Sequence, residues 1–181
     1  MPGAFVSLSV AMALVAVATS AHAQGSAATL PPSPPTCEAP EHRQFDFWIG
    51  EWTVRGKAGA VVGTSRIESA LGGCAIVEHW TSSGANRGTS LNFYDRTTRQ
   101  WMQTWIDNAG QPLHIAGALR DGRMVLEGTT PGAAGAPATR NRISWTPLDG
   151  GDVRQLWETS TDGGTTWTVS FDGRYSRNAS K

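Results

Sequence analysis

One pairing of residue types recurs along the chain: a side chain that can hydrogen-bond, followed two positions later by a tryptophan. The pairs are Glu78 with Trp80, Gln103 with Trp105, and Gln155 with Trp157. Residues two apart in a β-strand point to the same side of the sheet. If that side is the inside of a barrel, indole walls and a few polar groups would suit a small, partly apolar ligand. The alternative is a solid tryptophan core, in which these polar groups satisfy one another and the domain acts through its outer surface.

Three further residues are predicted to contact the same ligand. Asn92 and Tyr94 alternate together on an intervening strand, and Asp107 ends the strand that carries Trp105. A later alternating set would add hydrogen-bonding groups if it also points inward: Arg140, Arg142 and Ser144. Which side chains point inward depends on the phase of each strand, because a slip of one residue turns all of its side chains to the other face.

Catalytic chemistry has less support in the pattern. Glu78 and His79 are adjacent, so on a strand they point to opposite faces and cannot act on one substrate atom. Two buried carboxylates, Glu78 with Asp107 or Glu158, would permit acid–base chemistry across a barrel interior. The sequence has no Gly-x-Ser-x-Gly turn and no phosphate-binding glycine loop. We therefore predict no catalytic residues, and a barrel enzyme is the alternative to a ligand-binding protein.

Charge and histidine spacing bear on the partner. The chain has 15 Lys and Arg residues against 15 Asp and Glu residues, so it lacks the positive charge that binds phosphate backbones or anionic lipids. His42, His79 and His114 lie far apart, without the spacing that places two metal ligands on one element. We expect a small-molecule partner of unknown identity, and no nucleic acid, metal or cofactor.

The N-terminus has the features of an export signal. Residues 5–18 are apolar or small, and Ala21-His22-Ala23 is a small-x-small cleavage pattern, which predicts a signal peptide over residues 1–23. No Lys or Arg precedes the apolar run, so a retained anchor is the alternative. Residues 24–40, rich in Pro, Ser and Ala, are predicted to be a linker, and residues 178–181 a frayed end. The mature protein is expected to be periplasmic or secreted, with no membrane contact after cleavage.

Cysteine usage agrees with export. Cys37 and Cys74 are the two cysteines of the chain. An oxidising compartment favours their pairing in a disulfide, and two buried free thiols are the alternative.

The body of the chain is predicted to be all-β. Short alternating runs are separated by turn sequences such as Asp121-Gly122 and Asp149-Gly150-Gly151. About ten antiparallel strands in succession favour a closed up-and-down barrel, because closure removes exposed edges. The expected strands are 51–57, 61–70, 74–82, 88–95, 99–107, 112–120, 123–129, 139–147, 152–160 and 166–176. A short helical turn over residues 41–49 is expected before them, because Phe45, Trp48 and Ile49 share one helical face and Gly50 follows.

An ordered set of motifs carries a resemblance. It comprises residues 45–52 (FDFWIGEW), 72–80 (GGCAIVEHW), 101–107 (WMQTWID) and 154–158 (RQLWE). The set resembles an uncharacterised family of exported bacterial proteins with a lipocalin-like domain, of the calycin and nitrobindin-like type, across residues 41–177. The resemblance implies that the Gly50-x-Trp52 tryptophan closes one barrel end and stacks on an arginine of the last strand, Arg174 or Arg177.

The same resemblance bears on haem. Nitrobindin-like members hold haem through a histidine near the C-terminus, whereas this chain has no histidine after His114. Haem binding in that mode is therefore not expected, and only His79 or His114 could substitute.

Residues 160–167 (STDGGTTW) match the Asp-box of β-propellers. The motif occurs once and the chain is too short for a propeller. We expect a tight hairpin in which Asp162 caps backbone N–H groups.

Overall fold

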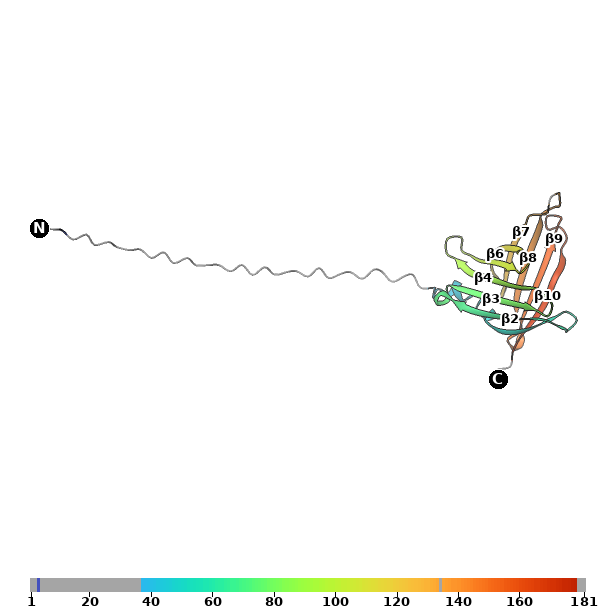
Figure 1. The fold of residues 1–181 in the computed structure, drawn as a ribbon, viewed down its shortest axis with the longest axis horizontal. Coiled ribbons are helices and arrows are strands. Elements are labelled where there is room, and N and C mark those ends of the chain that lie inside the picture. Colours follow the sequence, from blue (N-terminus) through green and yellow to red (C-terminus); the bar gives the residue numbers. More distant parts are fainter. Residues whose placement is uncertain (1–2, 4–36, 134, 179–181) are drawn as a thin grey trace. The chain divides into compact units, whose positions relative to one another are not determined.

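The computed structural model describes Gly3, residues 37–133 and residues 135–178 (Figure 1). Apart from Gly3, the predicted signal peptide lies outside the described residues, as do the linker residues 24–36 and the last three positions of the chain. Within the described residues, no helix has the length and apolar character needed to cross a membrane.

Ten antiparallel strands form one closed barrel, which confirms the predicted fold class. Each strand pairs with its neighbours in sequence, and β1 pairs with β10 to close the sheet. The strands are β1 (Gly50–Gly56), β2 (Val61–Ala70), β3 (Ala75–Ser82), β4 (Arg87–Asp95), β5 (Gln100–Asp107), β6 (Pro112–Arg120), β7 (Arg123–Thr130), β8 (Thr139–Pro147), β9 (Val153–Ser160) and β10 (Thr168–Arg177).

Alternation of burial along the strands explains why these residues form a barrel. On β8, Asn141, Ile143 and Trp145 are buried. Residues between them face outward because strand side chains alternate. The outward set is Arg140, Arg142 and Ser144, so these side chains add nothing to the barrel interior.

The predicted helical turn over residues 41–49 is two short 3₁₀ turns, η1 (Pro40–Arg43) and η2 (Asp46–Trp48). Phe45 separates them, with a backbone conformation (φ −110°, ψ 6°) outside the α-helical range. Two more 3₁₀ turns, η3 (Leu71–Gly73) and η4 (Asp149–Gly151), connect strands.

The segment with η1 and η2 plugs one end of the barrel with aromatic rings. Phe45 and Trp48 are fully buried and stack with ring centroids 5.0 Å apart. Phe45 also meets Trp101 and Trp145 edge-on, at 5.5 and 5.1 Å. These four rings and Trp52 belong to the buried hydrophobic core of the barrel.

Arg177 is the residue that stacks on Trp52 at the barrel closure. Its guanidinium carbon lies 4.5 Å from the ring centroid, and its Nη1 donates to the carbonyl of Ile49 at 3.3 Å. Gly50 leaves room for this arginine, since a β-carbon there would lie 2.6 Å from Nη1.

Arg174, the other predicted partner of Trp52, does not reach the ring. It forms an ion pair with Asp152, with 2.6 Å between Nε and Oδ2. The physical reason is strand alternation: Tyr175 points inward, so its neighbour Arg174 points outward, whereas Arg177 lies on the same side as Tyr175.

Cys37 and Cys74 form a disulfide, as predicted. The bond joins the start of the described domain to the connection between β2 and β3. A formed disulfide is typical of proteins that fold in an oxidising compartment.

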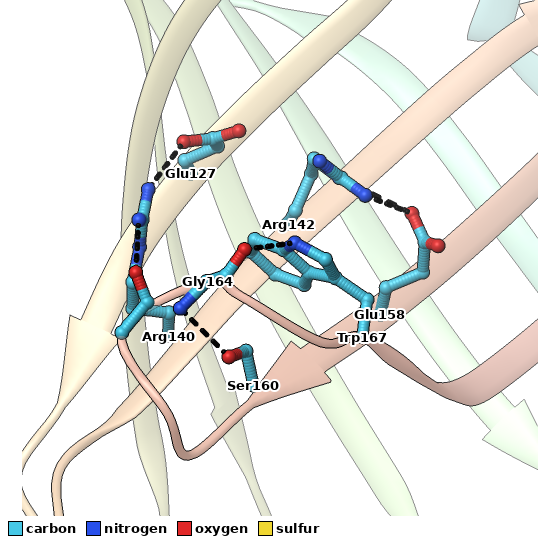
Figure 2. Close-up of polar contacts among 8 residues, drawn as sticks. Glu127, Arg140, Arg142, Glu158, Ser160, Gly164 and Trp167 are labelled. Atoms are coloured by element: carbon cyan, nitrogen blue, oxygen red, sulfur yellow. Dashed lines mark hydrogen bonds and ion pairs between the residues drawn. The ribbon is translucent and has the colours of Figure 1, made fainter.

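The Asp-box motif is the hairpin between β9 and β10 (Figure 2). The Asp162 carboxylate accepts hydrogen bonds from the Thr166 N–H and from the hydroxyls of Thr166 and Ser160. These bonds hold the pKa of Asp162 well below its usual range. Trp167 follows, with the Arg142 guanidinium 4.0 Å from its ring centroid on the outside of the barrel. The motif is thus structural in this chain.

Candidate functional site

The barrel contains a cavity of about 370 Å³. Ser82 and Asn86, which flank the β3–β4 connection, line it at the end opposite the aromatic plug. All three predicted pairs contribute to its wall: Glu78, Trp80, Gln103, Trp105, Gln155 and Trp157. The polar–tryptophan repeat of the sequence therefore lies on the inner face and around one space.

Other lining residues did not stand out in the sequence. They are Val62, Leu113, Ile143, Ser170, Phe171 and Tyr175, together with Ser82 and Asn86. The register of β10 shifts between Val169 and Phe171, and the adjacent residues Ser170 and Phe171 both line the cavity, which simple alternation does not predict. Phe171 meets Trp80 edge-on, at 6.1 Å between ring centroids.

Two glycines determine how the indole rings lie. A β-carbon on Gly88 of β4 would come 2.2 Å from Cζ2 of Trp105, and one on Gly63 of β2 would come 2.5 Å from Cη2 of Trp80. Each ring thus lies against the bare backbone of the neighbouring strand and leaves the cavity open. A glycine inside a strand signals such a close approach, and this sign was available in the sequence.

Trp157 is held by a different device. Its Nε1 donates to Oδ1 of Asn141 at 3.0 Å, while the amide nitrogen of Asn141 donates to Thr130 and to the carbonyl of Thr139. Because a backbone carbonyl can only accept, the Asn141 amide has one orientation, and its oxygen is the atom that faces the indole.

Glu78 is the buried charged group of the cavity wall, with 5% of its surface exposed. Its two carboxylate oxygens accept hydrogen bonds from the hydroxyls of Ser65 at 3.1 Å and Ser90 at 3.0 Å. Burial raises the pKa of Glu78 to about 7, although the two serine hydroxyls act in the opposite direction.

A chain of hydrogen bonds with a defined direction ends at Glu78. The amide nitrogen of Asn92 donates to the carbonyl of Ile76 at 3.1 Å, which leaves Oδ1 of Asn92 as an acceptor. Nε2 of Gln103 donates to that oxygen at 2.6 Å, and Asn92 also donates to Ser90, which donates to Glu78. Asn92 therefore lies behind Gln103 and not in the cavity wall, in contrast to its predicted role.

Tyr175 and Gln155 form a second polar pair in the wall. The Tyr175 hydroxyl donates to Oε1 of Gln155. Burial and the nearby charge of Glu78 raise the pKa of Tyr175 well above its usual value, so the hydroxyl stays neutral.

Tyr94 and Asp107, two further predicted ligand contacts, lie outside the cavity wall. Tyr94 points inward but sits at the plugged end, edge-on to His42 at 5.3 Å. Asp107 caps the β5–β6 turn, where Oδ1 accepts from the N–H groups of Ala109 and Gln111. Position along the barrel axis, which alternation does not report, separates both from the cavity.

The carboxylate pairs of the enzyme alternative are not formed. Glu78 is the sole Asp or Glu among the described residues that line the cavity. Glu158 faces outward and pairs with Arg142 at 3.0 Å, as Figure 2 shows.

The candidate metal and haem ligands are also apart from the cavity. His79 pairs with Glu68 at 3.2 Å, and His114 contacts Thr104, both on the outer face. In the part of the chain that the structure describes, no three His, Cys, Asp or Glu side chains group as metal ligands would.

Comparisons with known proteins identify neither a family nor a relative: no family model matches the chain, and no curated protein matches it.

Proposed function

We propose that this chain is an exported binding protein that holds a small, partly apolar molecule in the barrel cavity. The observation that carries the proposal is the cavity itself, with three indoles for walls and polar side chains set among them. Its volume of about 370 Å³ falls within the range of small-molecule pockets.

The site has the rigidity expected of a preformed pocket. Trp80 and Trp105 rest on glycines of neighbouring strands, and Trp157 is tied to Asn141 by a hydrogen bond. Side chains that are already ordered lose little conformational entropy when a ligand binds, so more of the contact energy appears as affinity.

Periplasmic or extracellular location is part of the same proposal. The disulfide between Cys37 and Cys74 supports folding under oxidising conditions. The apolar segment with its small-x-small pattern before Gln24 supports export of the chain.

Native mass spectrometry of residues 24–181, expressed in the periplasm of several hosts, tests the proposal. We expect a discrete mass above that of the denatured chain, corresponding to a co-purified molecule. The Trp105→Ala variant should lose it. Trp167→Ala is the matched control, because Trp167 packs on Arg142 outside the barrel and should keep the extra mass.

Calorimetry with a neutral probe provides the independent check. We expect tryptophol, an indole with an alcohol side chain, to bind saturably to the wild-type chain and to the Trp167→Ala control, and more weakly to Trp105→Ala. A bare mass from every host, together with no saturable tryptophol binding, would reject the proposal.

A further inference from the structure

We infer that the natural ligand of the cavity is a small organic ammonium ion: a protonated amine carried on an apolar body. The inference rests on the proposed binding function and names the chemical class of the ligand. It stands on three features of the cavity wall, namely its formal charge, its free hydrogen-bonding atoms and its aromatic rings.

The first feature is charge. Among the described residues that line the cavity, Glu78 is the sole side chain that can carry a full charge at neutral pH, and there is no Lys, Arg or His. The arginines of β8 and β9 point outward and are paired with carboxylates there, as in the pairs of Arg142 with Glu158 and Arg154 with Asp172. An anionic ligand would thus enter an apolar space with no counter-charge, at a large desolvation cost.

The second feature is the group of acceptors around Glu78. Gln103 donates one Nε2 hydrogen to Asn92, and its Oε1, which receives no hydrogen bond from the described residues, is left to accept from a ligand. The Tyr175 hydroxyl donates its hydrogen bond to Gln155, so the Tyr175 oxygen can only accept a hydrogen bond from a ligand. Each carboxylate oxygen of Glu78 accepts one serine hydroxyl and retains acceptor capacity.

The wall also holds donors: the second Nε2 hydrogen of Gln103, and the Nε2 group of Gln155, whose Oε1 accepts from Tyr175. The carboxylate oxygens of Glu78 are the strongest of the acceptors, so a ligand beside Glu78 must donate hydrogen bonds there. The N–H groups of a protonated amine have this property, and a carboxylate ligand has the opposite one.

The third feature is the aromatic wall. Trp80, Trp105, Trp157 and Phe171 surround the space in which Glu78 is the charged group. Indole is the strongest of the natural cation–π partners, and aromatic walls around a carboxylate are suited to an ammonium group with an apolar body.

The protonation of Glu78 agrees with this inference. Burial without a neighbouring cation keeps its pKa near 7, whereas an ammonium ion beside it would favour the charged form. Tyr175 is the one other titratable group in the cavity wall, and it remains neutral because its own pKa is raised.

Three indole probes of nearly equal size separate the possibilities: tryptamine, tryptophol and indole-3-acetate, which are cationic, neutral and anionic at pH 8. Binding to residues 24–181 is measured by isothermal titration calorimetry. We expect tryptamine to bind at least about tenfold tighter than tryptophol, as a charge-assisted hydrogen bond and a cation–π contact would give. Indole-3-acetate should bind more weakly than tryptophol.

The Glu78→Gln variant is the matched control for charge, since glutamine keeps the volume of the side chain. It should bring the ratio of tryptamine affinity to tryptophol affinity close to one, because the aromatic wall that both probes contact is unchanged and the charge is gone. Should this variant fail to fold, the wild-type chain is titrated at pH 5.5 and pH 8. Protonation of Glu78 at the lower pH should weaken tryptamine binding and leave tryptophol binding unaffected.

The outcomes distinguish the two proposals. Saturable tryptophol binding with tryptamine no tighter, or with indole-3-acetate tightest, overturns the ammonium inference and leaves the cavity function standing. Absence of binding by all three probes overturns both.

Discussion

The indole of Trp105 lies over Gly88 of the adjacent strand, at a point where a β-carbon would come within 2.2 Å of the ring atom Cζ2. The missing side chain of Gly88 is therefore what lets the ring lie flat against the barrel wall. A cavity wall formed in this way depends on a residue that itself contributes no contact to the ligand.

Gly88→Ala should close part of the cavity. The three atoms nearest to the β-carbon would all belong to the Trp105 ring, so the ring must move, and the space beside it is the cavity. We expect tryptophol affinity to fall at least about tenfold, the loss associated with about 1.4 kcal/mol. Calorimetry measures it, with Gly84→Ala as control, because a β-carbon there would have ordinary contact with Ser82. Equal affinities in the two variants would show that Gly88 does not set the position of the ring.

Stability of the ligand-free protein should fall as the pH rises from about 4.5 to about 7. Glu78 has a folded-state pKa of about 7 against 4.5 for the ordinary side chain, so the folded state binds more protons within this window. The stabilisation is complete below pH 4.5 and is lost as the pH passes the folded pKa, by on the order of 3 kcal/mol. Urea unfolding at a series of pH values measures the slope. Glu78→Gln, which cannot titrate, should flatten the curve, and parallel curves for the two proteins would contradict the assignment.

Removal of the disulfide should lower the free energy of unfolding and leave the barrel folded. The bond between Cys37 and Cys74 closes a loop that contains β1 and β2, and the loop-entropy model gives about 3 to 4 kcal/mol for a loop of this length. The double variant Cys37→Ser, Cys74→Ser should therefore unfold at lower urea concentration and retain tryptophol binding. Reduction of the wild-type chain should lower its unfolding midpoint similarly, while the double variant itself should not respond to reductant.

The two C-terminal arginines should differ in their effect on stability. Arg177→Ala removes the stack on Trp52 and the bond to the Ile49 carbonyl, which together contribute about 1 to 2 kcal/mol. Arg174→Ala removes an ion pair with Asp152 whose guanidinium is largely exposed, worth at most about 1 kcal/mol. Thermal unfolding of both variants checks the order. A larger loss in Arg174→Ala would mean that Arg177 does not secure the barrel end.

Much of the fold followed from local patterns that are complete within each hairpin. Alternating burial and Asp-Gly turns specify strands and their connections over neighbouring residues, so the observed strand ends differ from the predicted ones by no more than two positions. The pattern also predicted that the two members of each polar–tryptophan pair lie on one side of their strand, because residues two apart share a side.

The position of a side chain along the barrel axis could not be predicted from local patterns. Asn92 and Tyr94 share the inner face with Gln103, yet Asn92 lies behind Gln103 and Tyr94 lies at the aromatic plug. A period of two reports the side of a strand and says nothing of the level at which neighbouring strands bring residues together. That level depends on the stagger of all ten strands around the closed sheet.

The cavity itself was decided by contacts between strands. Gly88 and Trp105 belong to different strands, and their approach exists only once β4 and β5 are paired in register. The shift in β10 at Ser170, which lines the cavity beside Phe171, is likewise a property of the pairing of β10 with β9. The sequence by itself determined the strands and which side chains share a face of each strand. Packing across the closed sheet decided which face points inward and which of those groups meet around one space, because only closure sets the distances between strands.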